Sequence, residues 1–519
     1  MKRMSRSIRL IAVVGMFVLT GAGPTGAQSD ETRLATAFAD VDRLFTEFAT
    51  QAHVPGAAWG IVVRDVLVHS GATGFRDVGA KAPVDADTVF RIASMTKSFT
   101  AMSILKLRDE GKLSLDDPAE RYVPEMKGLA YPTDDSPRIT IRHLLSHSTG
   151  FPEDNPWGDR QLADTEDQLT QMLRQGIPFS NAPGVAYEYS NYGFAILGRI
   201  VSIVSRMKYE DYVSANILRP LGMTSTTLEP SKVPANRLAH GYRWEDAQWK
   251  EEPQLAHGSF GSMGGMLTSI RDLSRYVGVY LSAWPPRGGP ETAPIRRASL
   301  REMQQVWRPA PATISRDPAS GAVQFTAGGY AFGLRVSQTC SFRHIVEHGG
   351  GLPGFGSIMR WLPEHGVGII AFGNLTYTGW GRVTAEAFDR LAKTGGLRAL
   401  QSEPSRALTE ARDLVSQLVV KWDDNLADHI AAENLFLDYS KDRRRADTER
   451  LLATVGRCTP GSGFDFVENA LRGRWTLTCE RGRLEVAITL APSMPPKVQF
   501  ISVRPAPATP ARTDACPSL

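Results

Sequence analysis

Hydrophobic and polar positions divide the 519-residue chain into strand-rich and helix-rich sections. Apolar residues recur at helical spacing over 31–50, which predicts a helix. A second helix is expected over 94–110, because the pattern ends at Gly111 and glycine favours helix termination. Between the two helices, short apolar runs predict strands over 59–63, 66–71 and 88–92.

The section 112–250 contains mostly helical pieces that are interrupted by proline and glycine. Strand patterns return after it, over 329–336, 356–362 and 367–372. A helix over 380–393 is then closed by the glycine pair 395–396. Strands on both sides of a helical section predict an α/β fold in which a mixed sheet carries an inserted helical subdomain. We place this unit at residues 31–396.

A polar linker at 401–407 leads into a second unit, which we place at residues 405–504. Helical spacing occurs over 407–422 and 426–434. Alternating apolar and polar residues predict antiparallel strands over 475–479, 484–490 and 498–503. The sequence therefore predicts a small C-terminal α+β domain. The tail 505–519 contains four prolines and is expected to be disordered.

The first 27 residues have the pattern of a signal peptide. They begin with basic residues and no acid, continue with an apolar stretch over 10–19, and end in small residues at Ala27. The apolar stretch is too short for a stable transmembrane helix, although an uncleaved anchor is the alternative. We expect cleavage after Ala27 and export, which leaves a periplasmic or secreted protein without a stable membrane span.

The formal net charge of +4 comes entirely from this N-terminal segment, which holds four Lys and Arg residues. The rest of the chain balances 55 basic against 55 acidic residues and contains no basic run of five or more. Phosphate binding requires clustered Lys and Arg, so no nucleic-acid partner is expected.

The chain contains four cysteines: Cys340, Cys458, Cys479 and Cys516. An even number permits disulfides in an exported protein. Cys458 and Cys479 share one C-terminal segment and are the best candidates for a pair, with free thiols as the alternative. The CxxC spacing of zinc or redox sites does not occur, so no metal is expected.

A Ser-x-x-Lys pattern occurs three times: at Ser94/Lys97, Ser103/Lys106 and Ser205/Lys208. Only Ser94 lies where a predicted strand ends and a helix begins, so that free N–H groups and the helix dipole face its oxygen. Lys97 follows one turn later on the same face, where a desolvated amine can act as a base. The alternative for Ser94 is an ordinary helix cap.

Tyr189-Ser190-Asn191 is the only Tyr-x-Asn in the chain. A buried phenol beside a lysine can transfer protons, and an asparagine amide can hold a substrate carbonyl. The alternative is a core tyrosine near the start of a helix.

These motifs, together with the segments 141–150, 261–269 and 271–273, resemble the serine β-lactamase/penicillin-binding-protein superfamily in its class C-like branch. The resemblance extends over residues 35–395. It implies a mainly antiparallel sheet flanked by helices and a serine hydrolase without a cofactor. The branch includes class C β-lactamases, D-alanyl-D-alanine carboxypeptidases, D-aminopeptidases and esterases.

The family's third motif is Lys-Thr-Gly or His-x-Gly on a strand that lines the site. Lys393-Thr394-Gly395 matches literally but ends a predicted helix, so we assign the motif to His348-Gly349-Gly350. Gly349, Gly351 and Gly354 also fit a dinucleotide fingerprint, but a turn and a strand follow instead of a helix.

Two further patterns suggest other chemistries, and we set both aside. His143 and His147 have the spacing of a zinc motif, but Leu144 occupies the position of the required glutamate, so we interpret both histidines as structural. A G-x-S-x-G elbow, the mark of an α/β-hydrolase, does not occur.

The resemblance implies a role for each motif residue. Ser94 is the nucleophile, and Lys97 and Tyr189, singly or coupled, remove its proton. The N–H groups of Ser94 and Gly351, beside Gly350, form the oxyanion site. Tyr189 also protonates the leaving group, and Asn191 orients the substrate and the lysine.

The expected substrate is a small ester, a peptide or a β-lactam. His348 supplies no permanent cation where the β-lactamase pattern has lysine. An esterase or a D-amino-acid peptidase is therefore expected. The alternatives are a class C-like β-lactamase and a non-catalytic penicillin-recognition or cell-envelope binding protein. The oligomeric state does not follow from the sequence.

Overall fold

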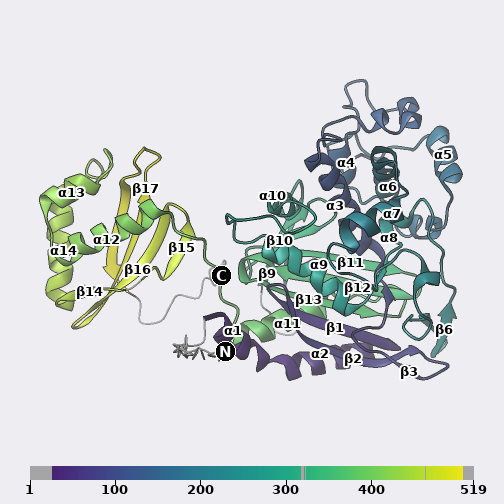
Figure 1. Cartoon of the computed structure of the whole chain (residues 1–519), viewed down its shortest axis with the longest axis horizontal. Coiled ribbons are helices and arrows are strands. Elements are labelled where there is room, and N and C mark those ends of the chain that lie inside the picture. The colour runs from purple at the N-terminus through teal and green to yellow at the C-terminus, as the bar shows by residue number, and fades with distance from the viewer. Residues whose placement is uncertain (1–25, 317–320, 322, 462, 507–519) are drawn as a thin grey trace, which may run out of the picture.

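A computed structural model describes residues 26–316, 321, 323–461 and 463–506 (Figure 1). Most of the expected signal peptide, most of the expected disordered tail and Cys516 lie outside the described residues. The tail was expected to begin at Pro505, but this residue is the last of strand β18 (Val498–Pro505). Within the described residues, we find no helix with the length and apolar character that crossing a membrane requires.

The larger unit is built on a nine-stranded sheet in which all neighbouring strands pair antiparallel. Two neighbouring strands of this sheet, β1 and β13, are about 300 residues apart in sequence. They pair with Trp59 opposite Ala371. The strands follow the order β3 (Ala82–Pro83), β2 (Val66–Asp77), β1 (Gly56–Val63), β13 (Val367–Gly373), β12 (Phe355–Leu362), β11 (Ile345–Leu352), β10 (Arg335–Thr339), β9 (Val323–Tyr330) and β8 (Arg308–Arg316). The predicted α/β class, with a mainly antiparallel sheet flanked by helices, is therefore confirmed.

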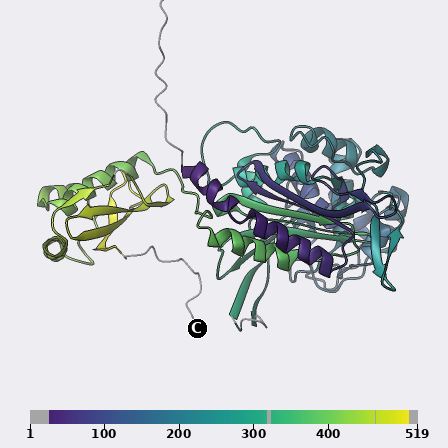
Figure 2. The same cartoon turned by 90° about the horizontal axis from the view of Figure 1, so that it is seen from below.

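Helices cover both faces of this sheet. On one face, α2 (Phe38–Gln51) and α11 (Gly381–Lys393) pack against each other and against the strands, as Figure 2 shows. α1 (Gly26–Ala35) precedes α2, so the helix predicted over 31–50 is two helices that meet at residues 36–37. On the other face, α9 (Ile270–Ser282) packs on β1, β2 and β13.

The helical subdomain lies on the same face as α9. Its centre is formed by α3 (Thr96–Asp109) and α6 (Asn191–Ser205), which pack against each other and against α8 (Gly261–Gly264). The first eleven residues of α6 are buried, as expected for a helix that is apolar on every side. An added Cβ at Gly198 would lie 2.3 Å from Ser262 Oγ, so glycine permits the close approach of α6 and α8. Shorter helices complete the subdomain: α4 (Ile141–Leu145), α5 (Glu166–Gln175) and α7 (Tyr209–Val213).

Two local predictions for this unit are wrong. The strand expected over 329–336 is interrupted, because residues 331–334 form the turn from β9 to β10. Gly333 takes a φ of +68° there, and an added Cβ would lie 2.6 Å from the carbonyl oxygen of Lys97. In addition, the section interpreted as helical contains a hairpin of β5 (Gly241–Glu245) and β6 (Gln248–Glu252).

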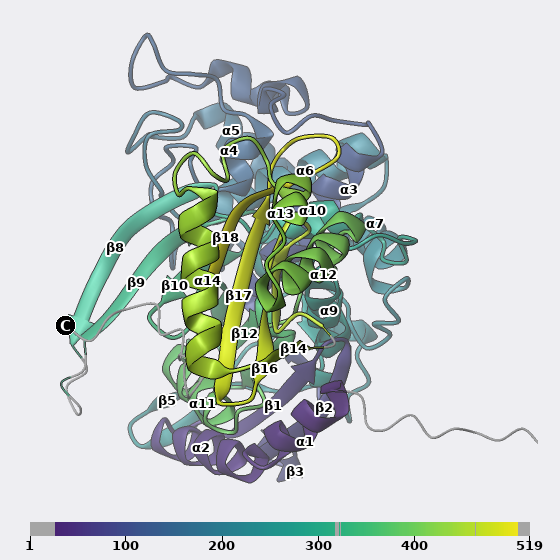
Figure 3. The ribbon, with the colours of Figure 1, turned by 90° about the vertical axis from the view of Figure 1, so that its left-hand side faces the viewer.

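The C-terminal unit has a separate sheet, which Figure 3 shows with its helices. Its separate hydrophobic core includes Trp475. A disulfide joins Cys458 to Cys479, which lie opposite each other on β14 and β16. Its strands are β14 (Cys458–Pro460), β15 (Phe466–Asn469), β16 (Arg472–Cys479), β17 (Gly482–Leu490) and β18. Its helices are α12 (Arg406–Val420), α13 (Asp424–Ile430) and α14 (Lys441–Val455). The sequence did not predict α14, because most of its residues are charged or polar and only Thr448 and Val455 are buried, so helical apolar spacing is weak.

Candidate active site

Ser94 lies on a sharp turn between a short strand and a buried helix. β4 (Phe90–Arg91) pairs with β7 (Leu267–Thr268), and a single 3₁₀ turn at residues 93–95 then leads directly into α3. Ala93 has a φ of +49°, a left-handed conformation that costs free energy for a residue with a side chain. This strained turn places the Ser94 hydroxyl at the first turn of the helical segment, where backbone N–H groups lack helical partners.

Strand β11 lies directly against this turn. An added Cβ at Gly350 would lie 2.2 Å from the carbonyl oxygen of Ile92, so only glycine fits. The Ser357 hydroxyl on β12 donates to the same carbonyl at 2.8 Å. Gly351 follows on β11, where an added Cβ would lie 2.7 Å from the Tyr377 ring. The glycine run therefore brings the backbone of β11 beside the serine.

Lys97 is completely buried, and its amine has three oxygen neighbours. Lys97 Nζ lies 3.1 Å from Ser94 Oγ, 2.6 Å from Asn191 Oδ1 and 2.9 Å from the carbonyl oxygen of Met263 on α8. A neutral amine has two N–H groups and one lone pair. The two N–H groups match the amide and carbonyl oxygens, which only accept, and the lone pair is left for the Ser94 proton.

Burial lowers the pKa of Lys97 to about 7, although the negative charges of Asp154, Asp159 and Glu153 partly oppose that shift. More than half of the amine is therefore uncharged once the pH exceeds about 7. A buried neutral lysine at hydrogen-bond distance from a serine can act as a general base.

Asn191 is held by the loop that precedes α5. Its side-chain Nδ2 donates to Asn155 Oδ1 at 2.7 Å, and its backbone N–H donates to Asp154 Oδ1 at 2.7 Å. Asp154 Oδ2 accepts from the N–H of Tyr192 at 2.8 Å. The buried carboxylate thus occupies the positive end of α6 and fixes the residue that contacts Lys97.

Tyr189 also contacts the serine. Its hydroxyl forms a hydrogen bond with Ser94, and its ring centre lies 4.8 Å from Lys97 Nζ. Burial raises the pKa of Tyr189 well above the ordinary value, so the phenol is neutral and can donate a proton. Ser94 therefore lies between an amine and a phenol.

His147 lies behind Tyr189, with 4.3 Å between the ring centres. Its Nδ1 accepts the backbone N–H of Ser190 at 3.1 Å, so this histidine supports the Tyr-x-Asn segment. His143 is the third residue of α4, where it takes part in a capping box with Thr140. The two histidines thus contact different partners, and no group of three metal-ligating side chains occurs among the residues described.

His348 is buried on β11 with both ring nitrogens engaged. Its Nδ1 lies 2.5 Å from the carbonyl oxygen of Gly349, which can only accept. Nδ1 therefore carries the proton, and Nε2 accepts the Tyr330 hydroxyl at 2.9 Å. Burial, together with the positive charges of Lys97 and Arg335, lowers the pKa of His348 to about 3. His348 is therefore neutral at physiological pH.

Arg335 is a candidate site residue that the sequence analysis missed. It begins β10, and its Nη2 donates to the Tyr187 hydroxyl, two residues before Tyr189, at 3.1 Å. Its positive charge contributes a lowering effect to the pKa of each of three neighbours: His147, Tyr189 and His348. The cross-strand pairing of Arg335 with Glu347 places it near the His348 motif, and only knowledge of that pairing could have indicated it.

The other motif matches lie in ordinary structural positions. Ser103 is within α3 and donates to the carbonyl of Phe99 at 2.8 Å, whereas Ser205 ends α6. Lys393-Thr394-Gly395 forms the end of α11, on the opposite face of the sheet. The dinucleotide-like glycines lie on β11 and in its turn to β12.

The comparison with protein families agrees with this geometry. The family model described as Beta-lactamase matches residues 41–394. Because the match covers more than half of the chain, the protein belongs to the beta-lactamase family. The resemblance to the serine β-lactamase/penicillin-binding-protein superfamily is therefore confirmed.

Two curated relatives match part of this chain. Protein flp of Staphylococcus aureus (strain N315) is 28% identical over 341 residues, which cover 64% of this chain and 62% of the relative. Penicillin-binding protein 4* of Bacillus subtilis (strain 168) is 27% identical over 308 residues, or 57% of this chain and 62% of the relative. The matched part thus spans less than two thirds of either relative.

Two solved structures share the fold at 21% sequence identity. The octameric penicillin-binding protein homologue from Pyrococcus abyssi has a TM-score of 0.58 and matches over 90% of both chains. A class C beta-lactamase in complex with cefoxitin has a TM-score of 0.54 over 70% of this chain and 99% of that chain.

Ser94 is predicted to be the residue that acylating and phosphonylating probes modify. A fluorophosphonate should label the wild type and Ser103→Ala equally, whereas labelling of Ser94→Ala should fall at least a hundredfold, because the attacking oxygen is lost. Gel fluorescence and peptide mapping measure the labelling. Equal labelling of Ser94→Ala would contradict the assignment.

The labelling rate should depend on pH through Lys97. Since neutral Lys97 accepts the proton, the rate should fall about tenfold per pH unit below pH 7 and level off above it. A pH series of fluorophosphonate inactivation rates checks this. His348→Gln should retain the same pH dependence, because His348 does not titrate in this range. A rate that rises as the pH falls below 7 would exclude Lys97 as the base.

Proposed function

We propose that this protein is a serine hydrolase that cleaves ester or amide bonds through an acyl-enzyme on Ser94, as an esterase or a D-amino-acid peptidase. The observation that carries the proposal is the position of Ser94 Oγ between the buried amine of Lys97 and the hydroxyl of Tyr189. This arrangement supplies a nucleophile, a base and an acid at one point.

The reaction follows from these positions. The Ser94 oxygen forms a bond to the substrate carbonyl carbon while its proton passes to the neutral amine of Lys97. The N–H groups of Ser94 and Gly351 stabilise the resulting oxyanion, a contribution of about 10²–10³ in rate for each donor. Tyr189 protonates the departing alcohol or amine as the carbonyl re-forms, and the proton held by Lys97 replaces the one that the phenol has lost. Water then attacks the acyl-enzyme and releases the acid and Ser94.

Two residues bear on the substrate class. His348 is neutral and fully engaged, so it provides no cation for a carboxylate. Arg335 is a permanent cation in the neighbourhood of the same motif, and it is solvent-exposed. We propose that a neutral ester needs no cation in the site. A D-amino-acid peptide with a free carboxylate, in contrast, depends on the positive charge of Arg335.

Substrate preference should follow this division. We expect a p-nitrophenyl ester and a D-alanyl peptide to have a higher kcat/KM than a cephalosporin. Arg335→Met should lower kcat/KM for the D-alanyl peptide about ten- to a hundredfold through loss of a charge-assisted contact, and should change that for the neutral ester less than threefold. Steady-state assays of the wild type and Arg335→Met on the three substrates measure the effect.

The controls distinguish the alternatives. His348→Lys should shift preference toward the cephalosporin, because a cation is added beside the site. Faster turnover of the cephalosporin than of the ester by the wild type would favour a class C-like β-lactamase. Labelling of Ser94 without turnover of any substrate would favour a penicillin-recognition or cell-envelope binding protein.

We also propose that the protein is exported to the periplasm or beyond the cell after cleavage at Ala27. The signal-like sequence and the Cys458–Cys479 disulfide support this, since disulfides persist in oxidising compartments. Non-reducing peptide mapping of protein expressed with its N-terminal segment should find a mature N-terminus at Gln28 and a linked Cys458–Cys479 peptide pair. An intact N-terminus with both thiols free would contradict export.

A further inference from the structure

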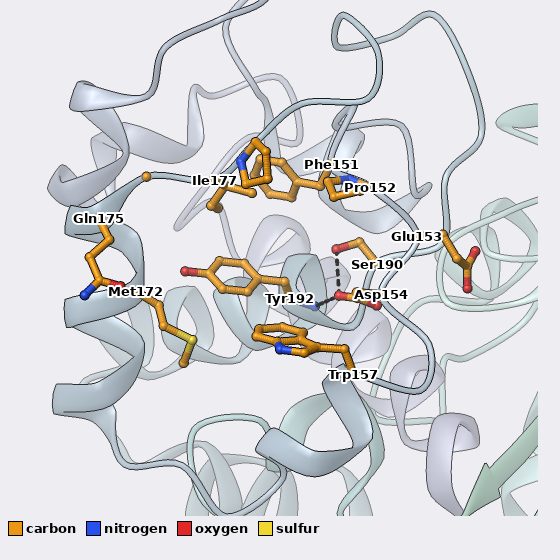
Figure 4. A pocket seen from close by; sticks show the side chains of 12 residues that line it. Phe151, Pro152, Glu153, Asp154, Trp157, Met172, Gln175, Ile177, Ser190 and Tyr192 are labelled. Carbon is orange, nitrogen blue, oxygen red and sulfur yellow. Dashed lines mark hydrogen bonds between the residues drawn. The ribbon is translucent and has the colours of Figure 1, made fainter.

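A cavity of about 360 Å³ lies behind the Tyr-x-Asn segment, between that segment and α5. Its walls are mainly apolar, and Figure 4 shows the Tyr192 ring extending from α6 between Phe151 and Trp157. The ring centres lie 6.1 Å apart for Phe151 and Tyr192, and 6.3 Å apart for Trp157 and Tyr192. Ile177 lies beside Phe151, and Met172 extends from α5 toward the same cavity.

The size of the cavity indicates the size of an occupant. An apolar cavity of about 150 Å³ is large enough for benzene. A cavity of about 360 Å³ can therefore hold two fused rings, and this volume is at the lower end of ordinary ligand pockets.

One polar group in the wall has no partner. The Tyr192 hydroxyl is buried without a hydrogen bond within the described part of the chain, and the residue is only 6% exposed. A buried hydroxyl without a partner is costly, and a ligand oxygen would relieve that cost. The Asp154 carboxylate is already bonded to Ser190, Asn191 and Tyr192, so it offers no comparable free site.

The charge of the wall selects against anions. Glu153 and Asp154 are the only charged residues of the lining, and both are acidic. A carboxylate or phosphate in the cavity would meet like charge in a partly desolvated space. The occupant therefore has one or two rings, no negative charge, and an oxygen that can pair with Tyr192.

We propose that this cavity is a second binding site, separate from the catalytic cleft, for a neutral one- or two-ring compound that carries a hydroxyl or carbonyl oxygen. The site shares a wall with the catalytic residues, because Asp154 and Ser190 line the cavity while Tyr189 and Asn191 flank Ser190. An occupant contacts the same loop that holds Asn191 through Asn155. The proposal does not require that the protein be a hydrolase.

Binding is measured directly with 2-naphthol as the probe, by ligand-detected NMR on the full chain. Met172→Trp, which fills the cavity, should raise the Kd at least tenfold. Met207→Trp adds the same bulk at a partly exposed position outside the cavity and should leave the Kd within twofold. Ile177→Phe serves as a second filling variant, and far-ultraviolet circular dichroism verifies the fold of each.

The polar contact is tested with matched compounds. Tyr192→Phe should raise the Kd of 2-naphthol about two- to tenfold, the usual effect of one hydrogen bond, and change that of naphthalene less than twofold. The anion 2-naphthoate should bind at least tenfold more weakly than 2-naphthol. Equal weakening of 2-naphthol and naphthalene by Tyr192→Phe would overturn the role of the hydroxyl.

A final comparison distinguishes a separate site from an extension of the cleft. Wild-type protein labelled at Ser94 with a small fluorophosphonate should bind 2-naphthol with a Kd within twofold of that of the unlabelled protein. Loss of binding on labelling would overturn a separate site. Binding that neither filling variant weakens would overturn the location. The binding measurements with the filling variants and with Tyr192→Phe can also be made in the Ser94→Ala background, so they are independent of turnover.

Discussion

The burial of the Lys97 amine is the constraint on which the rest of the active site depends. Moving an ammonium group out of water is unfavourable, and the protein responds by lowering the pKa of the lysine to about 7 while still supplying three oxygen neighbours. Each of these oxygens comes from a different part of the fold. Ser94 precedes α3, Asn191 begins α6, and Met263 is on α8.

The close packing of α3, α6 and α8 therefore has a chemical consequence. The helices must approach closely enough to exclude water from Lys97, and small residues such as Gly198 permit this. The turn from β9 to β10 closes the same region from the sheet side, because Gly333 lies against the carbonyl of Lys97. A looser arrangement would admit water, raise the pKa of the lysine and leave it protonated at neutral pH.

The loop that contains Asp154 and Asn155 connects this chemistry to a second part of the molecule. Its polar side chains hold the start of α6 and the amide of Asn191, whereas its aromatic neighbours Phe151 and Trp157 line the cavity. One segment thus contributes to both the proton-transfer site and an apolar pocket. The surroundings of Asn191 and the cavity therefore have this loop as a common wall.

The sequence by itself determined the class of fold, the family and the principal motifs. Ser94, Lys97, Tyr189 and Asn191 stand in a pattern that recurs across the family, and hydrophobic periodicity located most strands and helices around them. It also separated His348-Gly349-Gly350 from the literal Lys393-Thr394-Gly395, because the latter ends a helix. These features are local in sequence, so residue order alone is informative about them.

Only the tertiary structure decided which distant residues meet. Arg335 lies near the His348 motif because β10 pairs with β11, and Asp154 holds α6 because its loop folds back 37 residues along the chain to Asn191. The periodicity of hydrophobic residues likewise did not predict the charged helix α14 or the apolar cavity beside Tyr192, because both depend on packing against other elements. The physical reason is common to all four. Strand pairing, burial and pKa shifts depend on three-dimensional neighbours, and a single sequence specifies those neighbours only through the completed fold.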